Sequence, residues 1–183
     1  MASTLWTIGH STRPIDELLE LLLAHEIAHL VDVRTIPRSR FNPQFNADAL
    51  AHSLSDAGLR YRHLPELGGL RHPKKDSVNL GWRNEGFRGY ADYMQTEEFR
   101  AALEALMADS RAQRTAIMCA EAVPWRCHRS LIADMLTIRG WTVQHIVTRK
   151  EVRVHSMTPF AVVRDGTLTY PSDPGSTPSA RLF

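Results

Sequence analysis

The sequence predicts an α/β fold, a single three-layer domain with a mostly parallel central sheet flanked by helices. Short apolar segments alternate along the chain with segments of helical periodicity, which favours parallel strands joined by crossover helices. The segment 115–119 is continuously apolar, as expected of a central strand covered on both faces. The length of 183 residues suits one domain with one sizeable core.

The first half of the chain supplies three predicted strands and two predicted helices. A strand over 5–9 precedes a helix from Pro14 to about Glu26, which Ser11 or Thr12 can cap. The elements that follow are a strand over 29–34, a polar loop over 35–46, a helix over 47–57 with Gly58 as its C-cap, and a strand over 59–64.

The second half begins with a long loop over 65–86, rich in Gly, Pro and charge. Loops of this length in compact domains are usually functional or disordered. We expect residues 1–170 to form the domain and residues 171–183 to form a loosely ordered tail. The remaining predicted elements are helices over 89–94, 97–109 and 127–139, strands over 115–119 and 141–147, and a terminal hairpin of 162–164 with 168–170 around Asp165-Gly166.

Composition narrows the class of protein. The apolar fraction of 43% and charged fraction of 23% are ordinary for a globular domain. No apolar run approaches the roughly 18–20 residues that cross a bilayer, and the first residues lack the pattern of a signal peptide. Two cysteines are too few for a disulfide framework, which suits a reducing compartment. We therefore expect a cytoplasmic protein with no membrane partner.

Positive charge is carried mainly by arginine. Of the 22 basic residues, 19 are Arg and three are Lys. Arginine suits forked recognition of phosphate and carboxylate, although a coding sequence rich in G and C produces the same bias. Basic residues concentrate between Arg60 and Arg88 and again at Arg34, Arg38 and Arg40. The net charge of +2 is too small by itself to indicate a nucleic-acid-binding protein.

The predicted sheet brings several polar segments to one edge. In open parallel sheets, ligands bind beyond the carboxyl ends of the strands, near the switch in strand order. We therefore expect the segments that directly follow the strands to converge on one crevice. These segments are His10-Ser11, Arg34, Pro65-Glu66 with Gly68-Gly69, and Cys119 to Glu121.

The richest candidate site runs from Cys119 to Arg129, after an apolar strand and into a helix. A helix N-terminus carries unpaired N–H groups and a partial positive charge, so it stabilises an anion or a thiolate. Three uses are open. Arg126 or Arg129 could bind an anion; Cys119 or Cys127 could be a nucleophile of low pKa, with Glu121 or His128 moving protons; or Cys119, Cys127 and His128 could hold a divalent metal with one further ligand.

The spacing in this segment selects none of the three uses. Arg126 lies seven positions after Cys119, which differs from the Cys-x5-Arg of phosphatase loops. An adjacent Cys and His make an awkward zinc pair without a second pair elsewhere. Cys119 could also be a small apolar residue that ends a buried strand. The sequence therefore implies no particular cofactor and assigns no metal ligand.

The second candidate site is Asp32-x-Arg34 with Arg38 and Ser39-Arg40. Asp32 lies in an otherwise apolar strand, and a buried carboxylate normally needs a partner. Asp32 could pair internally with Arg34 and orient the following loop. Alternatively, Asp32 could be a general base while Arg34, Arg38 and Arg40 bind phosphate.

Two weaker patterns complete the candidates. His10-Ser11 could start a turn that contacts substrate, or could be a hydrogen-bonded His beside a capping Ser. Aromatic residues that interleave with Arg83 and Arg88 could stack nucleobases or could pin the long loop to the core. These aromatic residues are Trp82, Phe87, Tyr90 and Tyr93.

Five blocks of residues follow one another in a characteristic order: Thr7 to Ser11, Asp32 to Arg34 with Pro37 and Ser39-Arg40, Leu64 to Gly69, Phe87 with Tyr90 to Met94, and Cys119-Ala-Glu121 with Pro124 and Cys127 to Arg129. Taken in order, these blocks resemble a bacterial and archaeal family, domain-of-unknown-function family 488, over roughly residues 5–160. His145-Ile146 and His155 also resemble its C-terminal pattern. The resemblance implies a compact α/β fold and a shared polar site, and it implies no reaction.

The leading hypothesis is an enzyme, a hydrolase or transferase, that acts on a phosphate-bearing substrate such as a nucleotide or nucleic acid. One alternative is a thiol-dependent enzyme with Cys119 as the nucleophile, and another is a non-catalytic nucleic-acid- or nucleotide-binding module. The oligomeric state is left open. The candidate catalytic residues are Asp32, Glu121, His10, Cys119 and His128, and the candidate substrate-binding residues are Ser11, Arg34, Arg40, Arg126, Arg129 and Tyr90.

Overall fold

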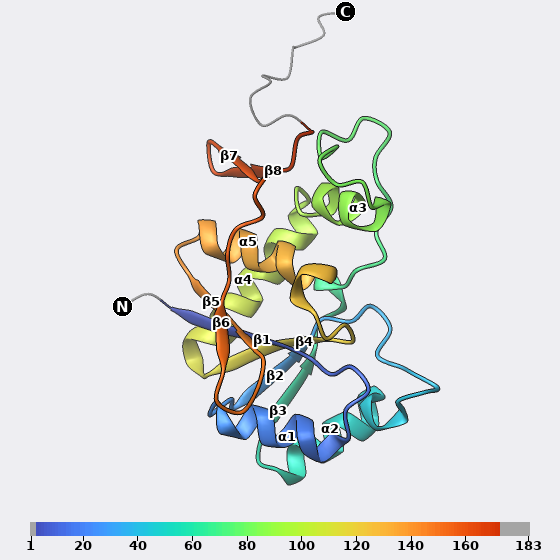
Figure 1. The fold of residues 1–183 in the computed structure, drawn as a ribbon, viewed down its shortest axis with the longest axis vertical. Coiled ribbons are helices and arrows are strands. Elements are labelled where there is room, and N and C mark those ends of the chain that lie inside the picture. The colour runs from blue at the N-terminus through green and yellow to red at the C-terminus, as the bar shows by residue number, and fades with distance from the viewer. Residues whose placement is uncertain (1–2, 173–183) are drawn as a thin grey trace, which may run out of the picture.

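The computed structural model describes residues 3–172, which form three layers with a sheet in the middle and helices on its two faces (Figure 1). The strand order is β3-β2-β4-β1-β5-β6; neighbouring strands among the first five are parallel, and β6 is antiparallel to β5 at the edge. The predicted α/β fold with a mostly parallel sheet is confirmed. The strands are β1 (Thr4–Gly9), β2 (His29–Asp32), β3 (Arg60–His63), β4 (Thr115–Cys119), β5 (Thr142–Ile146) and β6 (Val152–Val154).

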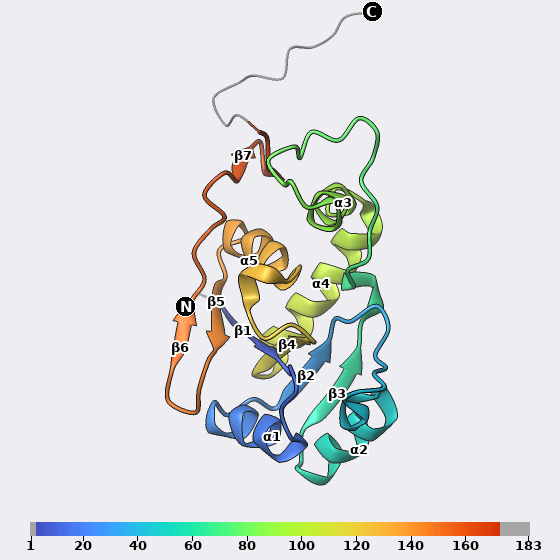
Figure 2. The ribbon, with the colours of Figure 1, turned by 45° about the vertical axis from the view of Figure 1, so that its right-hand side comes forward.

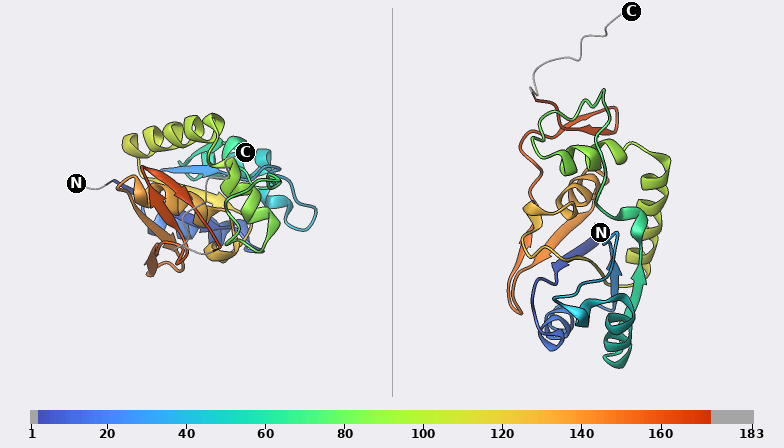
Figure 3. Two further views of the ribbon diagram at one scale, coloured as in Figure 1. Left: turned by 90° about the horizontal axis from the view of Figure 1, so that it is seen from above. Right: turned by 90° about the vertical axis from the view of Figure 1, so that its right-hand side faces the viewer.

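Helices cover both faces of the sheet, as Figure 2 shows from a second direction. Helices α1 (Ile15–Ala24) and α2 (Ala47–Asp56) lie on one face. Helices α4 (Glu97–Ala112) and α5 (Arg129–Ile138) lie on the other, and α3 (Glu85–Tyr93) packs beside them. Two short strands, β7 (Val162–Arg164) and β8 (Thr167–Thr169), form a separate hairpin next to the long loop that precedes α3 (Figure 3).

The alternation of side chains in β4 explains the two cores. Ala116 and Met118 point to the layer of α1 and α2, whereas Ile117 points to the layer of α4 and α5. All three side chains are fully buried. Because a central parallel strand needs apolar residues on both faces, the continuous apolar run at 115–119 predicts this position correctly.

The connections make a switch point between β1 and β4. The two strands are neighbours, with Gly9 paired to Cys119. Strand β1 leads into α1 on one face, and β4 leads into α5 on the opposite face. The loops after the two strands therefore diverge and leave a crevice between them. Gly9 is required here, since a Cβ at this position would lie 2.0 Å from the carbonyl oxygen of Glu121.

Several predicted details hold and others do not. Strand β4 has its predicted bounds, and Asp165 and Gly166 turn the hairpin with positive φ angles of 48° and 73°. The predicted cap of α1 by Ser11 or Thr12 is wrong, because Pro14 occupies the N-cap and no side chain caps the helix. Strand β6 was not predicted, since a run of three residues is too short to distinguish a strand from a loop by its pattern. Residues 173–183 of the predicted tail lie outside the described residues.

No helix within residues 3–172 is long and apolar enough to cross a membrane.

Candidate functional site

A cavity of about 750 Å³ opens beyond the carboxyl ends of the central strands. Three sides of it come from His10-Ser11 after β1, Arg34 after β2, and the segment 119–122 after β4. The turn that enters α5 adds Cys127 and His128, and Gly69 lines the cavity next to His128. The structure thus brings together most of the segments that we expected to meet at one crevice.

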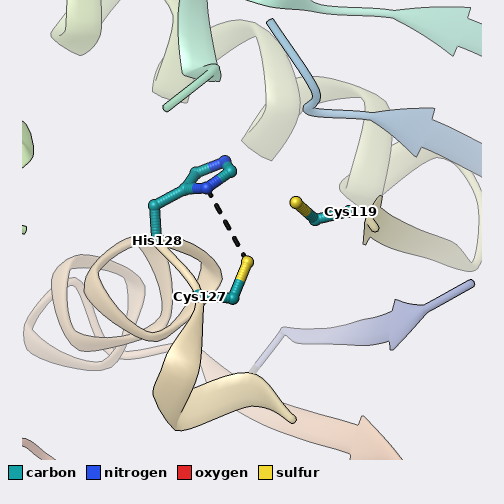
Figure 4. A group of neighbouring side chains, drawn as sticks. All are labelled: Cys119, Cys127 and His128. Atoms are coloured by element: carbon teal, nitrogen blue, oxygen red, sulfur yellow. Dashed lines mark hydrogen bonds between the residues drawn. The ribbon is translucent and has the colours of Figure 1, made fainter. Parts of the chain in front are cut away.

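Cys119, Cys127 and His128 form the most concentrated group in this cavity. Cys119 ends β4, while Cys127 and His128 lie directly before α5, so two elements present the three side chains to one another (Figure 4). One ligand atom from each residue lies within 4.8 Å of the other two. The Sγ atom of Cys127 lies 3.7 Å from Nδ1 of His128. Both cysteines are free thiols.

The ring of His128 is held by its second nitrogen. Nε2 lies 3.1 Å from the carbonyl oxygen of Val33, to which it donates a hydrogen bond. A neutral His128 therefore carries its proton on Nε2 and turns the lone pair of Nδ1 towards Cys127. Gly69 makes room for the ring, since a Cβ there would lie 3.2 Å from Nδ1 of His128.

Arg129 brings a buried positive charge to Cys127. Its side chain is 1% exposed, and it forms no ion pair with any acidic side chain of residues 3–172. Nε donates to Cys127 Sγ at 3.5 Å, Nη1 donates to the Thr7 hydroxyl, and Nη2 donates to the Glu121 carbonyl. A buried guanidinium needs compensation, and the sulfur of Cys127 is the contacting atom that can become an anion.

The pKa values of the two cysteines are shifted in opposite directions. The pKa of Cys127 lies well below its ordinary value, chiefly because the Cys119 thiol stabilises the thiolate, with His128 and Arg129 contributing further. The pKa of Cys119 is raised, first by its contact with Cys127 and then by burial. Cys127 is therefore the residue on which negative charge settles, and sequence reasoning had favoured Cys119 for that property.

Asp32 and Arg34 form a buried pair. Arg34 donates from Nε and Nη2 to the two Asp32 carboxylate oxygens at 2.8 and 2.6 Å, and its backbone N–H donates to Oδ1. Tyr61 donates to Oδ2 at 2.9 Å. Asp32 does not line the cavity, whereas Arg34 does. Of the two readings left open by the sequence, this geometry favours the internal pair that orients the loop after β2.

His10 lies at the base of the cavity and is 2% exposed. Burial lowers its pKa to about 4, so the ring is neutral at pH 7. Nδ1 donates to the carbonyl oxygen of Ser11 at 2.7 Å, and Nε2 accepts from Arg34 at 3.3 Å. A neutral ring with both nitrogens engaged positions its neighbours and is a poor proton donor to substrate.

Three charged side chains at the mouth of the cavity have no charged partner within residues 3–172. Arg38 and Arg126 are exposed and form neither an ion pair nor a side-chain hydrogen bond there. Glu121 also lines the cavity, and its carboxylate accepts a hydrogen bond from the backbone N–H of Val123 at 3.3 Å. These groups stay available to a ligand.

The other predicted binding residues are distributed unevenly. Ser11 lines the cavity, with a positive φ of 51° and a backbone N–H that donates to the Ala120 carbonyl. Tyr90 is buried in the cavity wall, and its hydroxyl donates to the Leu67 carbonyl. Arg40 is exposed but lies outside the cavity lining, and Arg129 sits behind Cys127.

The aromatic residues of the long loop and of α3 contact one another and the core. Trp82 packs against Phe87 and Phe160 with ring centroids 4.9 Å apart in each case, and against Tyr170. Tyr93 is covered by the guanidinium of Arg71. This arrangement favours the reading in which these rings pin the loop to the core.

Sequence reasoning missed a buried polar chain behind the site. The Thr7 hydroxyl, which accepts from Arg129, donates to Nδ1 of His145 at 2.7 Å. His145 bonds to His155 at 3.0 Å, and His155 bonds to Asp134 at 2.8 Å. Burial lowers the pKa of His145 to about 4, so its ring is neutral. Its Nδ1 accepts from Thr7 and its Nε2 donates to His155. His145 and His155 were visible in the family pattern, but nothing in the sequence joined them to Asp134.

The fold and the site together define a class: an α/β protein with a cavity at the switch point of a mostly parallel sheet and a cysteine–histidine group in its wall. The family model described as Domain of unknown function DUF488 matches residues 14–136, and the chain belongs to this family. The match confirms the resemblance drawn from the sequence blocks. No curated protein and no solved structure matches the chain.

Proposed function

We propose that the protein is a hydrolase that acts on a phosphate-bearing substrate, such as a nucleotide or nucleic acid, in the cavity at the switch point. The observation that carries the proposal is the juxtaposition of Arg38, Arg126 and Glu121 on the lining of one cavity, each without a charged partner within residues 3–172. Two guanidinium groups against one carboxylate favour an anionic ligand, and arginine binds phosphate oxygens in a fork.

The residues take distinct roles in this proposal. Arg38 and Arg126 bind the phosphate together, Arg38 from the loop after β2 and Arg126 from the turn after β4. Glu121 accepts a proton from the attacking water, because its carboxylate faces the cavity and is engaged by a single backbone N–H. The Asp32–Arg34 pair orients the loop after β2, which carries Arg38.

A substrate panel tests the proposal. Chromogenic phosphate mono- and diesters and nucleotides are offered to the wild type, Glu121→Gln and Arg126→Ala. Loss of a general base lowers kcat by about 10²- to 10⁴-fold, whereas loss of a phosphate-binding arginine acts mainly on KM. Arg83→Ala, an exposed arginine outside the cavity, is the matched control. Unchanged turnover of an identified substrate in Glu121→Gln would contradict the assigned role.

A thiol-dependent enzyme is a second candidate, and the buried Arg129 beside Cys127 favours it. In this version the nucleophile is Cys127, with Cys119 as its thiol neighbour. Alkylation by iodoacetamide at pH 6, followed by peptide mapping, tests it. The candidate requires Cys127 to react faster than a cysteine in a model peptide, and equal or slower reaction rules it out.

A further inference from the structure

We infer that Cys119, Cys127 and His128 bind a zinc ion whose fourth coordination position opens into the cavity. This inference deepens the proposed hydrolase, since it names the group that would activate water there. The binding itself depends only on the three side chains and can be tested apart from any activity.

The donor atoms have the right kind and the right spacing. Two thiolates and one imidazole match the Cys₂His set of zinc sites that keep a fourth position open. Bond lengths of about 2.3 Å to sulfur and about 2.0 Å to nitrogen place tetrahedral ligands about 3.5–3.8 Å apart. Cys127 Sγ and His128 Nδ1 lie 3.7 Å apart, and no pair exceeds 4.8 Å. Closing the widest pair takes a movement of about 1 Å, within reach of a small rotation of a cysteine side chain.

Cys119 comes from a different element than the adjacent Cys127 and His128. Adjacent cysteine and histidine residues make a poor pair by themselves, but β4 delivers a second sulfur from the neighbouring strand end. Figure 4 shows the three side chains pointing towards a common space.

The surrounding hydrogen bonds are those of a prepared metal site. Metal-binding histidines usually donate their other N–H to a carbonyl or carboxylate, which fixes the tautomer. His128 does so through Nε2 to the Val33 carbonyl, which leaves Nδ1 as the ligand atom. Arg129 donates its Nε–H to Cys127 Sγ and so supports a negatively charged sulfur. Two thiolates neutralise the dication, and a chain of hydrogen bonds through Thr7, His145 and His155 joins Arg129 to the buried Asp134.

The open side of the group faces the proposed reaction space. Cys119, Cys127 and His128 all line the cavity that Glu121 and Arg126 also line. A zinc-bound water has its pKa lowered to about 7, so it can be deprotonated near neutral pH. Glu121 stands outside the ligand group and is available to take the proton.

Zinc content and Co(II) substitution test the inference on the whole chain. Untagged protein purified without chelator is analysed for metal, then stripped and titrated with Zn(II) and Co(II). We expect about one zinc per chain, and with Co(II) both the visible bands of tetrahedral coordination and thiolate-to-metal charge transfer. Cys119→Ser and Cys127→Ser should each weaken zinc binding by more than about 100-fold, beyond the 10- to 100-fold typical of losing an outer partner. His72→Ala, at an exposed histidine of the long loop, should bind as the wild type does.

The inference is overturned if the wild type binds less than about one tenth of an equivalent and gives no charge-transfer band. It is also overturned if both serine variants keep wild-type affinity, because the metal then sits elsewhere. The wild-type Co(II) spectrum decides the question even if a variant fails to fold. Zinc bound as expected with no turnover of phosphate esters would refute the proposed hydrolase and leave the metal site standing.

Discussion

Replacing Asp32 by Asn should destabilise the protein by about 3–5 kcal/mol, because it leaves a buried guanidinium without its counter-charge. Asp32 is 0% exposed and Arg34 is 6% exposed, so water cannot compensate for the lost charge. The carboxylate accepts two side-chain bonds and one backbone bond from Arg34, and a fourth bond from Tyr61. An amide in the same place turns an NH₂ group towards some of these donors.

Urea denaturation followed by circular dichroism measures this cost. A thermal melt gives a second readout. In a domain of this size, each kcal/mol moves the thermal midpoint by about 2–4 °C, so the midpoint should fall by roughly 6–20 °C. Tyr61→Phe removes one of the four donors and should cost about 1–3 kcal/mol. The double variant Asp32→Asn/Arg34→Gln should cost less than the sum of the single changes. A loss below about 1 kcal/mol in Asp32→Asn, accompanied by loss of turnover, would refute the structural pair and restore Asp32 as a general base.

Three further predictions concern buried residues near the cavity and in the chain of hydrogen bonds behind it. His10 and His145 have pKa values lowered to about 4 from 6.5, so the unfolded chain binds more protons than the folded chain between these values. The contribution of these two groups to the free energy of unfolding should therefore be constant above pH 6.5. It should fall as the pH drops towards 4, by up to about 3 kcal/mol for each residue. A flat profile from pH 6.5 to 4 would contradict their buried, neutral state. Gly9→Ala places a Cβ 2.0 Å from the Glu121 carbonyl and should cost at least about 2–3 kcal/mol, whereas Gly140→Ala, with no atom within 4 Å of the added Cβ, should show only the smaller strain of its positive φ. Thr7→Val removes the link between Arg129 and His145 and should cost about 1–3 kcal/mol by urea denaturation, and a neutral effect would show that the chain of hydrogen bonds carries no stability.

The sequence was most informative where one local pattern determines one local structure. The apolar run at 115–119 located the central strand, and Asp165-Gly166 located a turn that requires positive φ. The rule that ligands bind beyond the strand ends predicted that His10, Arg34 and Cys119 meet at one crevice, and all three line the cavity.

The roles within the site depended on contacts that no local pattern contains. Asp32 looked equally suited to catalysis and to pairing, and the choice required knowing that Tyr61 and Arg34 occupy its oxygens. Cys119 ends an apolar strand and Cys127 precedes a helix, and it is chiefly their contact with each other, with His128 and Arg129 beside Cys127, that lowers the pKa of Cys127.

Contacts between residues that are far apart in the sequence could not be predicted from it. The chain from Thr7 through His145 and His155 to Asp134 joins residues that are separated by up to 138 positions. Strand β6 is an edge strand of three residues, and its pairing with β5 depends on the turn between them more than on its own side chains.

The most direct test of the account is a thermal-shift titration with inorganic phosphate and 5′-nucleotides. The wild type is compared with the double variant Arg38→Ala/Arg126→Ala and with the control Arg83→Ala. A ligand at 100 times its Kd stabilises the native state by about 2.7 kcal/mol, which corresponds to a rise of roughly 5–11 °C. The account predicts such a rise in the wild type and in the control, and its loss in the double variant. No rise with any phosphate-bearing compound, or an equal rise in the double variant, would contradict the assignment of the cavity as a phosphate-binding active site.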